Sequence, residues 1–401
     1  TEEVLNKQGG MRKAMENFTY CTPTKLIFGK GVIKKLPGIA GEYGKRVLLT
    51  YGGGSIKKIG LYDEVKRLLE GFEIYELSGI EPNPKYSTSV LDGVRICKEK
   101  NIDVVLAVGG GSVLDCSKAI CAGALYDGEP WDLISYKVKA KAALPLLDII
   151  TLAATGSEYD SGCVISRTET NDKVGYLDNL LYPAVSFLDP TYTFSVSRKQ
   201  TAAGAADAIN HVMEQYFCEK HSMLTDGMCE AAIKSLIENA KIALKEPENY
   251  EARGEFMVDC TLACNGILSI GNSPSGWACH GIEHALSAYY DITHGEGLAI
   301  VTPRWMKHIL NEKTIDRIVS FGTHIFGIDS TLAKEKIAEK TIEKTYEMFE
   351  SFGMPMHLKD VGVDGERLGE MAHHIAVKEG LDKAWAPLTE EDIFDILKES
   401  L

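Results

Sequence analysis

The chain has 401 residues, of which 45% are hydrophobic and 25% are charged, a composition typical of soluble globular proteins. This length exceeds what one ordinary hydrophobic core accommodates, so two domains are expected. The formal net charge of −14 argues against non-specific binding to nucleic acid or to anionic membranes, and no apolar run is long enough to span a bilayer.

The ten cysteines are scattered through apolar segments, and no two of them form a CxxC pair. This pattern favours reduced, mostly buried thiols in a cytoplasmic protein over a thiolate zinc site. The sequence MENFTY, which begins at Met15, is typical of a natural start. Residues 1–14 are therefore expected to be an added extension that takes no part in the fold.

The first half of the chain alternates buried strands with helices. Strands are expected at 24–29, 46–51, 72–77, 102–108, 146–152, 164–166 and 185–188, and helices at 61–70, 90–100 and 113–124. This alternation predicts an α/β domain with a Rossmann-like parallel sheet, which binds ligands at the carboxyl ends of its strands.

Two of these strands end in glycine-rich turns that lead into helices. Gly52-Gly53-Gly54-Ser55 follows the strand at 46–51, and Gly109-Gly110-Gly111-Ser112 follows the strand at 102–108. Glycines let a phosphate approach the backbone, and the next helix offers free N–H groups at its start. Neither run is a GxGxxG or a Walker A motif, and a plain strand-to-helix turn is the alternative. Two such turns in one sheet predict a site for the two ends of a dinucleotide.

Further polar residues near these turns are candidates for the same site. Asp115 lies one turn into the helix at 113–124 and could face the ligand, whereas Lys118 is expected to be a solvated charge. The segment TLAATGSE at 151–158 follows a buried strand and carries hydroxyl groups that suit ribose or phosphate. The alternative is a simple turn capped by Ser and Thr.

From about residue 197 the sequence contains no clear strand. Helices are expected at 201–218, 225–244, 250–269, 277–290 and 297–310, with helical structure continuing to the C-terminus. A boundary near residue 195 is therefore expected between an α/β domain at 15–195 and an all-helical domain at 196–401.

Histidines are concentrated in this helical half. His280, His284 and His294 occur within fifteen residues, and Asp207 and His211 lie four positions apart on an earlier helix. Taken singly, each pair is more often an ordinary helix-surface hydrogen bond or a satisfied core histidine. Taken together with the nucleotide signals, a carboxylate and several imidazoles predict a site for a divalent metal, either iron or zinc.

These motifs together resemble the iron-containing (group III) alcohol dehydrogenases, and within them the branch of butanol dehydrogenases and NADPH-dependent aldehyde reductases. The resemblance extends from about residue 17 to the C-terminus. It is carried by TPTKLIFGKG at 22–31, YGGGSIKKIG at 51–60, GIEPNP at 79–84, AVGGGSVLDCSK at 107–118, ATGSE at 154–158, DAINHVMEQY at 207–216, and the cluster of His280, His284 and His294.

This resemblance implies a nucleotide-binding domain, a helical metal-binding domain, a site in the cleft between them, and a homodimer. The metal ligands would be Asp207, His211, His280 and His294, while His284 would lie near the nicotinamide without binding metal. The metal would polarise a substrate carbonyl as hydride arrives, and His284 would relay the proton. The expected activity is the interconversion of short-to-medium-chain primary alcohols and aldehydes with NAD(P)(H).

The resemblance also implies a set of cofactor contacts. The pyrophosphate would lie at Gly110, Gly111 and Ser112, and the rest of the cofactor would lie along Thr151, Thr155 and Lys173. Asp160 stands where the family has a polar Thr or Asn beside the nicotinamide, which is a departure from the pattern.

The turn after the first buried strand bears on the choice of cofactor. NAD-specific enzymes commonly place an acid there, which bonds the 2′-hydroxyl of the ribose. Gly53, Gly54 and Ser55 offer no acid, and Lys57 and Lys58 follow directly. Open N–H groups and a nearby ammonium suit a 2′-phosphate, so NADP(H) is expected to be preferred. Solvated lysines and dual specificity for NADP(H) and NAD(H) are the alternative.

Three other functions remain as alternatives. A polyol dehydrogenase of the same superfamily would share the metal and the fold, and a dehydroquinate-synthase-like enzyme would need more basic residues around the metal. A non-catalytic nucleotide-binding protein could instead carry a structural metal, which is usually held by four protein ligands.

Overall fold

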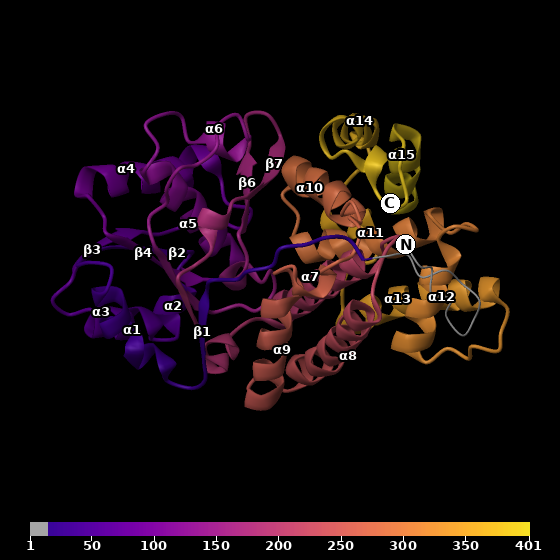
Figure 1. Cartoon of the computed structure of the whole chain (residues 1–401), viewed down its shortest axis with the longest axis horizontal. Coiled ribbons are helices and arrows are strands. Elements are labelled where there is room, and N and C mark those ends of the chain that lie inside the picture. The colour runs from indigo at the N-terminus through magenta and orange to yellow at the C-terminus, as the bar shows by residue number, and fades with distance from the viewer. Residues whose placement is uncertain (1–14) are drawn as a thin grey trace.

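The computed structural model describes residues 15–401, and the expected extension at 1–14 lies outside the described residues. An α/β half is followed by a helical half, and the two lie side by side (Figure 1). The predicted fold class is confirmed. The last strand of the first half ends at Leu188 and the first long helix of the second begins at Arg198.

The α/β half contains a six-stranded parallel sheet with the strand order β1-β8-β5-β4-β2-β3. The strands are β1 (Lys25–Phe28), β2 (Arg46–Tyr51), β3 (Glu73–Leu77), β4 (Val104–Gly109), β5 (Leu146–Ile150) and β8 (Val185–Leu188). The chain runs outward from β2 to β3 and then returns to β4 on the other side of β2. A parallel sheet binds ligands at such a reversal, beyond the carboxyl ends of the strands. Both predicted glycine-rich turns lie there, one after β2 and one after β4.

Helices cover both faces of this sheet, as the continuous apolar runs of its central strands predict. They are α1 (Leu36–Gly41), α2 (Ser55–Lys58), α3 (Leu61–Leu68), α4 (Leu91–Lys100), α5 (Gly111–Ala124) and α6 (Trp131–Ile134). Alternate residues of β4 enter different cores, because Leu106 packs in one cluster and Val105 in another. The cluster that contains Val105 continues into the helical half, so the two halves share one hydrophobic core.

A two-stranded antiparallel hairpin projects from the α/β half toward the helices (Figure 1). It consists of β6 (Gly162–Arg167) and β7 (Asp172–Leu177), and it pairs Ser166 with Lys173. The strand predicted at 164–166 is part of β6, whereas β7 has no counterpart among the predicted elements. Its sequence DKVGYL begins with two charged residues and contains a glycine, so it lacks an apolar strand pattern.

The helical half is built around α7 (Arg198–Tyr216), which is buried from Thr201 to Tyr216. The remaining helices are α8 (Met223–Lys245), α9 (Tyr250–Ala263), α10 (Ala278–Tyr290), α11 (His294–His308), α12 (Ile315–Phe326), α13 (Lys334–Phe352), α14 (Leu368–Lys378) and α15 (Glu390–Glu399). The helix predicted at 250–269 ends early, and a left-handed Gly266 with φ 85° separates α9 from a short 3₁₀ turn. Among the described residues, no helix combines the length and the apolar character that crossing a membrane requires.

A buried carboxyl lies in the middle of the sheet, where burial favours its neutral form. Ser186 Oγ lies 2.6 Å from Asp148 Oδ2 and 2.7 Å from the carbonyl oxygen of Glu158. The Ser186 hydroxyl has a single hydrogen and lies within hydrogen-bond distance of both oxygens, and a proton on Asp148 would let both contacts be full hydrogen bonds. Burial raises the pKa of Asp148 well above its ordinary value, which agrees with this assignment.

Asp148→Asn is expected to gain stability relative to the parent as the pH rises. A carboxyl whose pKa is raised by folding stabilises the fold fully only below its unfolded pKa of about 3.9, and the contribution is lost as the pH rises toward the folded value. Asn keeps a donor to Ser186 and does not titrate. The difference in unfolding free energy should therefore grow by about 1.4 kcal/mol per pH unit above that value, as followed by urea unfolding at several pH values. A difference that does not change with pH would contradict the neutral carboxyl.

Candidate metal centre and cofactor cleft

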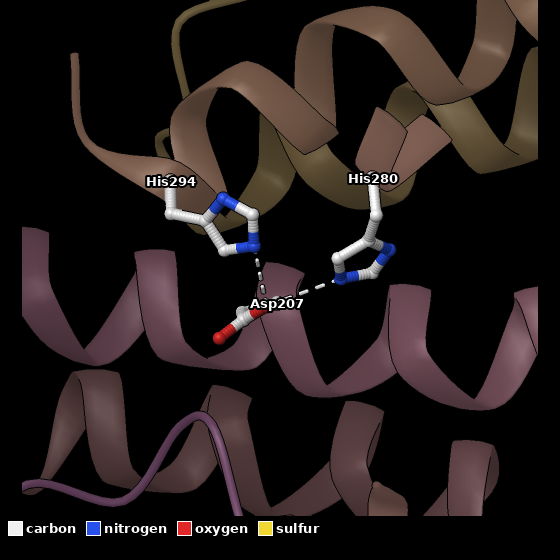
Figure 2. Close-up of side chains that lie close together, drawn as sticks. All are labelled: Asp207, His280 and His294. Atoms are coloured by element: carbon white, nitrogen blue, oxygen red, sulfur yellow. Dashed lines mark ion pairs between the residues drawn. The ribbon is translucent and has the colours of Figure 1, made fainter. Parts of the chain in front are cut away.

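Four of the predicted ligands converge although they come from three helices. Asp207 and His211 lie one turn apart on α7, His280 lies on α10, and His294 is the first residue of α11. The Asp207 Oδ1 atom lies 3.5 Å from Nε2 of His211, 3.8 Å from Nε2 of His280 and 3.5 Å from Nε2 of His294. Figure 2 shows the imidazoles of His280 and His294 directed toward the Asp207 carboxylate. Ligands at about 2.1 Å from a tetrahedral zinc lie roughly 3.4 Å apart, so these separations suit a metal.

Two of these four ligand atoms also lack hydrogen-bond partners. Asp207 Oδ1 and His280 Nε2 are buried and form no hydrogen bond. A buried polar atom without a partner costs about 1–3 kcal/mol, so such atoms are uncommon unless something else satisfies them. The ligand atoms of Asp207, His280 and His294 lie within 4.8 Å of one another, which a single cation can bridge. His211 is not part of that group, and its ring stacks on His280 with centroids 4.8 Å apart.

Two buried glutamates hold the imidazoles in place. Glu214, on α7, contacts Nδ1 of His280, and Glu283, on α10, contacts Nδ1 of His294. A carboxylate at Nδ1 fixes the tautomer and leaves the Nε2 lone pair free to bind a metal. Glu214 also accepts hydrogen bonds from the backbone N–H groups of Cys279 (2.7 Å) and His280 (3.1 Å). It therefore ties the start of α10 to α7.

The sequence analysis missed both glutamates, although their spacing carries a signal. Glu214 follows His211 by three positions on α7, and Glu283 follows His280 by three positions on α10. Residues three apart share a helix face, so both carboxylates lie on the faces that carry the histidines.

The pKa values of the cluster residues shift in different directions. Burial lowers the pKa of His211 to about 3, so this imidazole is neutral at pH 7. Burial alone would lower the pKa of His280 as well, but the Glu214 carboxylate raises it to about 9, and a metal must displace a proton there. Burial alone would raise the pKa of Asp207, yet the positive charge that the imidazoles of His211 and His294 carry when protonated lowers it below its usual range. Burial keeps the pKa of His284 well below its ordinary value, and Lys173 lowers it further.

A second group of possible ligands overlaps the first. Glu283, His284 and His294 also have ligand atoms within 4.8 Å of one another. Glu283 is already occupied, because Lys173 Nζ lies 3.2 Å from its Oε2 atom and the Ser287 hydroxyl contacts its Oε1 atom. The unpaired atoms of Asp207 and His280 favour the first group.

A cavity of about 490 Å³ joins this cluster to the predicted cofactor residues. The helical half contributes Asp207, His211, His280, His284 and His294 to its wall. The α/β half contributes Ser112, Asp115, Thr155, Asp160 and Lys173. The two sets were predicted from separate motifs, and they line one cavity between the halves.

The glycine-rich turn after β4 is closely packed. A Cβ atom at Gly111 would lie 2.4 Å from Thr155 Oγ1, and one at Gly110 would lie 3.0 Å from Leu152 Cβ. The Thr151 N–H donates to the Gly109 carbonyl at 3.0 Å. These contacts hold the loops after β4 and β5 together, and only glycine fits at position 111 without displacing Thr155.

The other predicted turn, with Gly53, Gly54 and Ser55, leads into α2 and lies outside the lining of that cavity. Thr151 lies outside the lining as well. Gly54 has φ 104°, a conformation that favours glycine, whereas a Cβ atom at Gly53 would meet nothing within 4 Å.

The prediction that Lys118 is solvated was wrong. Its side chain is fully buried, and Nζ donates to Asp160 Oδ1 (2.7 Å), the Asp160 carbonyl (3.0 Å) and the Gly162 carbonyl (2.7 Å). Helix α5 is covered on one side by the sheet and on the other by the hairpin, so no face remains for a solvated charge at this position. Asp160, which departs from the family pattern, thus places its carboxylate beside the buried ammonium of Lys118.

Asp115 and Lys173 are also engaged within the protein. Asp115 accepts hydrogen bonds from the Ser157 hydroxyl (2.7 Å) and the Val164 N–H (2.9 Å), and burial raises its pKa to about 6. Lys173 Nζ reaches across to Glu283, which links the hairpin to α10. Both residues line the cavity while holding its walls.

Comparisons with known proteins agree with these observations. The family model described as iron-containing alcohol dehydrogenase matches residues 23–190, and the model for the C-terminal part of the Fe-containing alcohol dehydrogenase family matches residues 201–401. The chain is 46% identical over 391 residues to NADH-dependent butanol dehydrogenase A of Clostridium acetobutylicum, covering 96% of this chain and 100% of the relative. It is 39% identical over 358 residues to the NADPH-dependent aldehyde reductase YqhD of Escherichia coli, covering 88% and 91%. The crystal structure of NADH-dependent butanol dehydrogenase A from Thermotoga maritima superposes with a TM-score of 0.91 at 39% identity, covering 96% of this chain and 99% of that one.

Proposed function

The chain belongs to the iron-containing alcohol dehydrogenase family, a class of NAD(P)-dependent oxidoreductases, and we propose that it interconverts short-to-medium-chain aldehydes and primary alcohols such as butanal and butanol. The observation that carries this proposal is the convergence of Asp207 with His280 and His294 on the wall of a cavity that also reaches Ser112 at the start of α5. A wall that could hold a metal and a turn that could hold a nucleotide, in one cavity, would bring a Lewis acid and a hydride donor to the same carbonyl.

We propose that Asp207, His211, His280 and His294 hold a divalent cation, iron or zinc. When bound, the cation would polarise the carbonyl oxygen and stabilise the negative charge that develops there. The protein orients the proposed ligands, since Glu214 contacts Nδ1 of His280 and fixes the orientation of that imidazole. Burial of the cluster strengthens its interactions with charge, because little water is present to compete.

His284 is proposed to carry the proton. Its ring centroid lies 6.4 Å from that of His280 and 5.8 Å from that of His294, and the residue lines the cavity. Its lowered pKa keeps the imidazole neutral at pH 7, so one ring nitrogen can donate a proton and the other can accept one. It would deliver a proton to the developing alcohol or remove one in the reverse direction.

The nucleotide is proposed to lie across the reversal between β2 and β4. Ser112 and the backbone N–H groups at the start of α5 would bind the pyrophosphate, and the nicotinamide would extend along Thr155 and Asp160 toward the metal. The turn at Gly53, Gly54 and Ser55, after the neighbouring strand, would receive the adenosine end.

A preference for NADP(H) stays a proposal, since the relatives named above include one NADH-dependent and one NADPH-dependent enzyme. Its support is that the turn residues Gly53, Gly54 and Ser55 include no acid and that one acid on the neighbouring strand is already engaged. Glu76, on the strand beside β2, already accepts hydrogen bonds from Tyr51, Tyr62 and Lys66. Lys57 lies with its Nζ atom over the Tyr62 ring at 4.7 Å. This contact leaves Lys58 as the better candidate for a phosphate.

Gly53→Asp is expected to shift the cofactor preference toward NADH. The position has room for a side chain, and an acid there would repel a 2′-phosphate while bonding a 2′-hydroxyl. The ratio of kcat/KM for NADH to that for NADPH should rise by about tenfold, the effect of roughly 1.4 kcal/mol. Gly53→Asn supplies the hydrogen bond without the charge and serves as the control. A parent enzyme that strongly favours NADH, or an unchanged ratio in the variant, would show that this turn has another role.

The overall proposal is tested by incubating the metal-loaded protein with aldehydes of two to six carbons and each reduced cofactor. Turnover of butanal that depends on the metal supports the proposal. Binding of metal and nucleotide without oxidation of the cofactor would favour a structural metal instead. The homodimer and the cytoplasmic location stay predictions, which light scattering and cell fractionation would test.

A further inference from the structure

Trp277 forms the part of the cavity wall that lies against the metal cluster. Its ring centroid is 5.1 Å from that of His280 and 6.0 Å from that of His211, and it meets both rings edge-on at 78° and 63°. The two imidazoles stack on each other, so the indole covers the edges of both. No other tryptophan lines this cavity within the described part of the chain.

The backbone holds this indole in place. Trp277 has φ 49° and ψ 49°, a left-handed conformation that is an outlier for a bulky residue and that persists only where the surroundings impose it. The preceding Gly276 has φ 95°, and a Cβ atom there would lie 2.4 Å from Ala384 Cβ. The Trp385 N–H donates to the Ser275 carbonyl at 2.8 Å. The segment before α10 is therefore fixed against residues 384–385.

We propose that Trp277 sets the specificity at the carbon next to the carbonyl, so that the site accepts unbranched aldehydes and rejects α-branched aldehydes and ketones. This inference rests on the proposed function. A substrate whose oxygen lies at the cluster has its carbonyl carbon and its α-carbon within a few ångströms of His280, where the indole stands. The cavity of about 490 Å³ must also receive the nicotinamide, because Thr155 and Asp160 line it too. In this proposal a branch at the α-carbon meets the indole that stands against His280.

Trp277→Gly removes this wall without straining the backbone, because glycine readily adopts a positive φ. The ratio of kcat/KM for 2-ethylbutanal to that for butanal should rise by ~10-fold or more, the range that one or two methylene groups command in a hydrophobic pocket. Trp277→Phe should give an intermediate ratio. Asn101→Gly, at another left-handed position outside the cavity lining, should leave the ratio unchanged.

Binding of unreactive amides separates this inference from the proposed function. Butyramide and 2-ethylbutyramide resemble the two aldehydes, and calorimetry on the metal-loaded protein with reduced cofactor gives their Kd values. The parent should bind the unbranched amide more tightly, and Trp277→Gly should lose that difference while retaining its metal. If the parent does not reduce butanal but discriminates between the amides, the proposed function fails and the role of Trp277 stands. The role of Trp277 is refuted if Trp277→Gly retains its metal while its kcat/KM ratio for the two aldehydes and its Kd ratio for the two amides equal those of the parent. If Trp277→Gly loses metal, the same criterion applies to Trp277→Phe.

Discussion

His280→Ala is expected to lose nearly all bound metal and nearly all activity while keeping the fold. The imidazole presents an unpaired Nε2 atom 3.8 Å from Asp207 Oδ1, and its loss removes one of the proposed ligands. Losing a group that merely orients a ligand costs 10–100-fold in metal affinity, so losing the ligand itself should cost more than ~10²-fold. The fold should survive because Glu214 still accepts the backbone N–H groups of Cys279 and residue 280. The Glu214 carboxylate therefore keeps two hydrogen-bond donors in the variant.

Metal per chain, far-ultraviolet circular dichroism and kcat/KM with butanal measure this outcome together, and His294→Ala should behave in the same way. His324→Ala is the matched control, because that histidine is largely exposed on α12 and lies outside the cavity lining. Ligand imidazoles must be neutral, so the parent should also release metal as the pH falls. Full activity in a metal-free His280→Ala protein would refute the assignment.

His284→Ala is expected to keep its metal and to slow turnover by ~10²-fold, the usual contribution of a positioned general acid or base. The residue lies one turn after His280 and lines the same cavity, but it is absent from the group formed with Asp207. Burial and Lys173 hold the pKa of its imidazole well below the ordinary value, so in this proposal a proton passes through the neutral ring, received at one nitrogen as another leaves the second nitrogen. The loss should therefore appear in kcat and in the pH profile rather than in metal content.

Added imidazole should restore part of the activity of His284→Ala, since the cavity leaves space where the ring was. His284→Asn, which retains a hydrogen bond but cannot exchange a proton near pH 7, should be as slow as His284→Ala. Loss of metal in either variant would instead make His284 a ligand and would favour the group with Glu283 and His294.

Burial explains the prediction of the central strands, whereas β1 and β3 were predicted although neither contains a fully buried residue. Strands β4, β5 and β8 are buried along their whole length, and their apolar runs identify them. β7 lies in a half-exposed hairpin, and its register depends on pairing with β6 rather than on its own residues. The early end of α9 depends on the conformation of Gly266, which a helical pattern in the neighbouring residues does not show.

The candidate site also combines features that the sequence shows with contacts that it does not show. Histidines four apart on one helix are visible in the sequence, and the structure brings His280 and His294 to Asp207. Glu214 and His280 are 66 positions apart, and their contact depends on how α7 and α10 pack. Lys118 was misread for a related reason, because its burial follows from the hairpin that covers α5. Spacing along one element is readable from the sequence, whereas the meeting of α7, α10 and α11 at the cluster was predicted only through the family resemblance.

The hydrophobic core that continues from the sheet into the helices restricts how this protein can be recombined with its relatives. Gly204 on α7 lies so close to the α/β half that a Cβ atom there would stand 2.6 Å from the Ala153 carbonyl oxygen. A chimera that joins the sheet of one relative to the helices of another must match surfaces that fit at this distance, or it will expose apolar area and aggregate. Cofactor preference is therefore better exchanged between relatives by substituting single loops than by substituting whole domains.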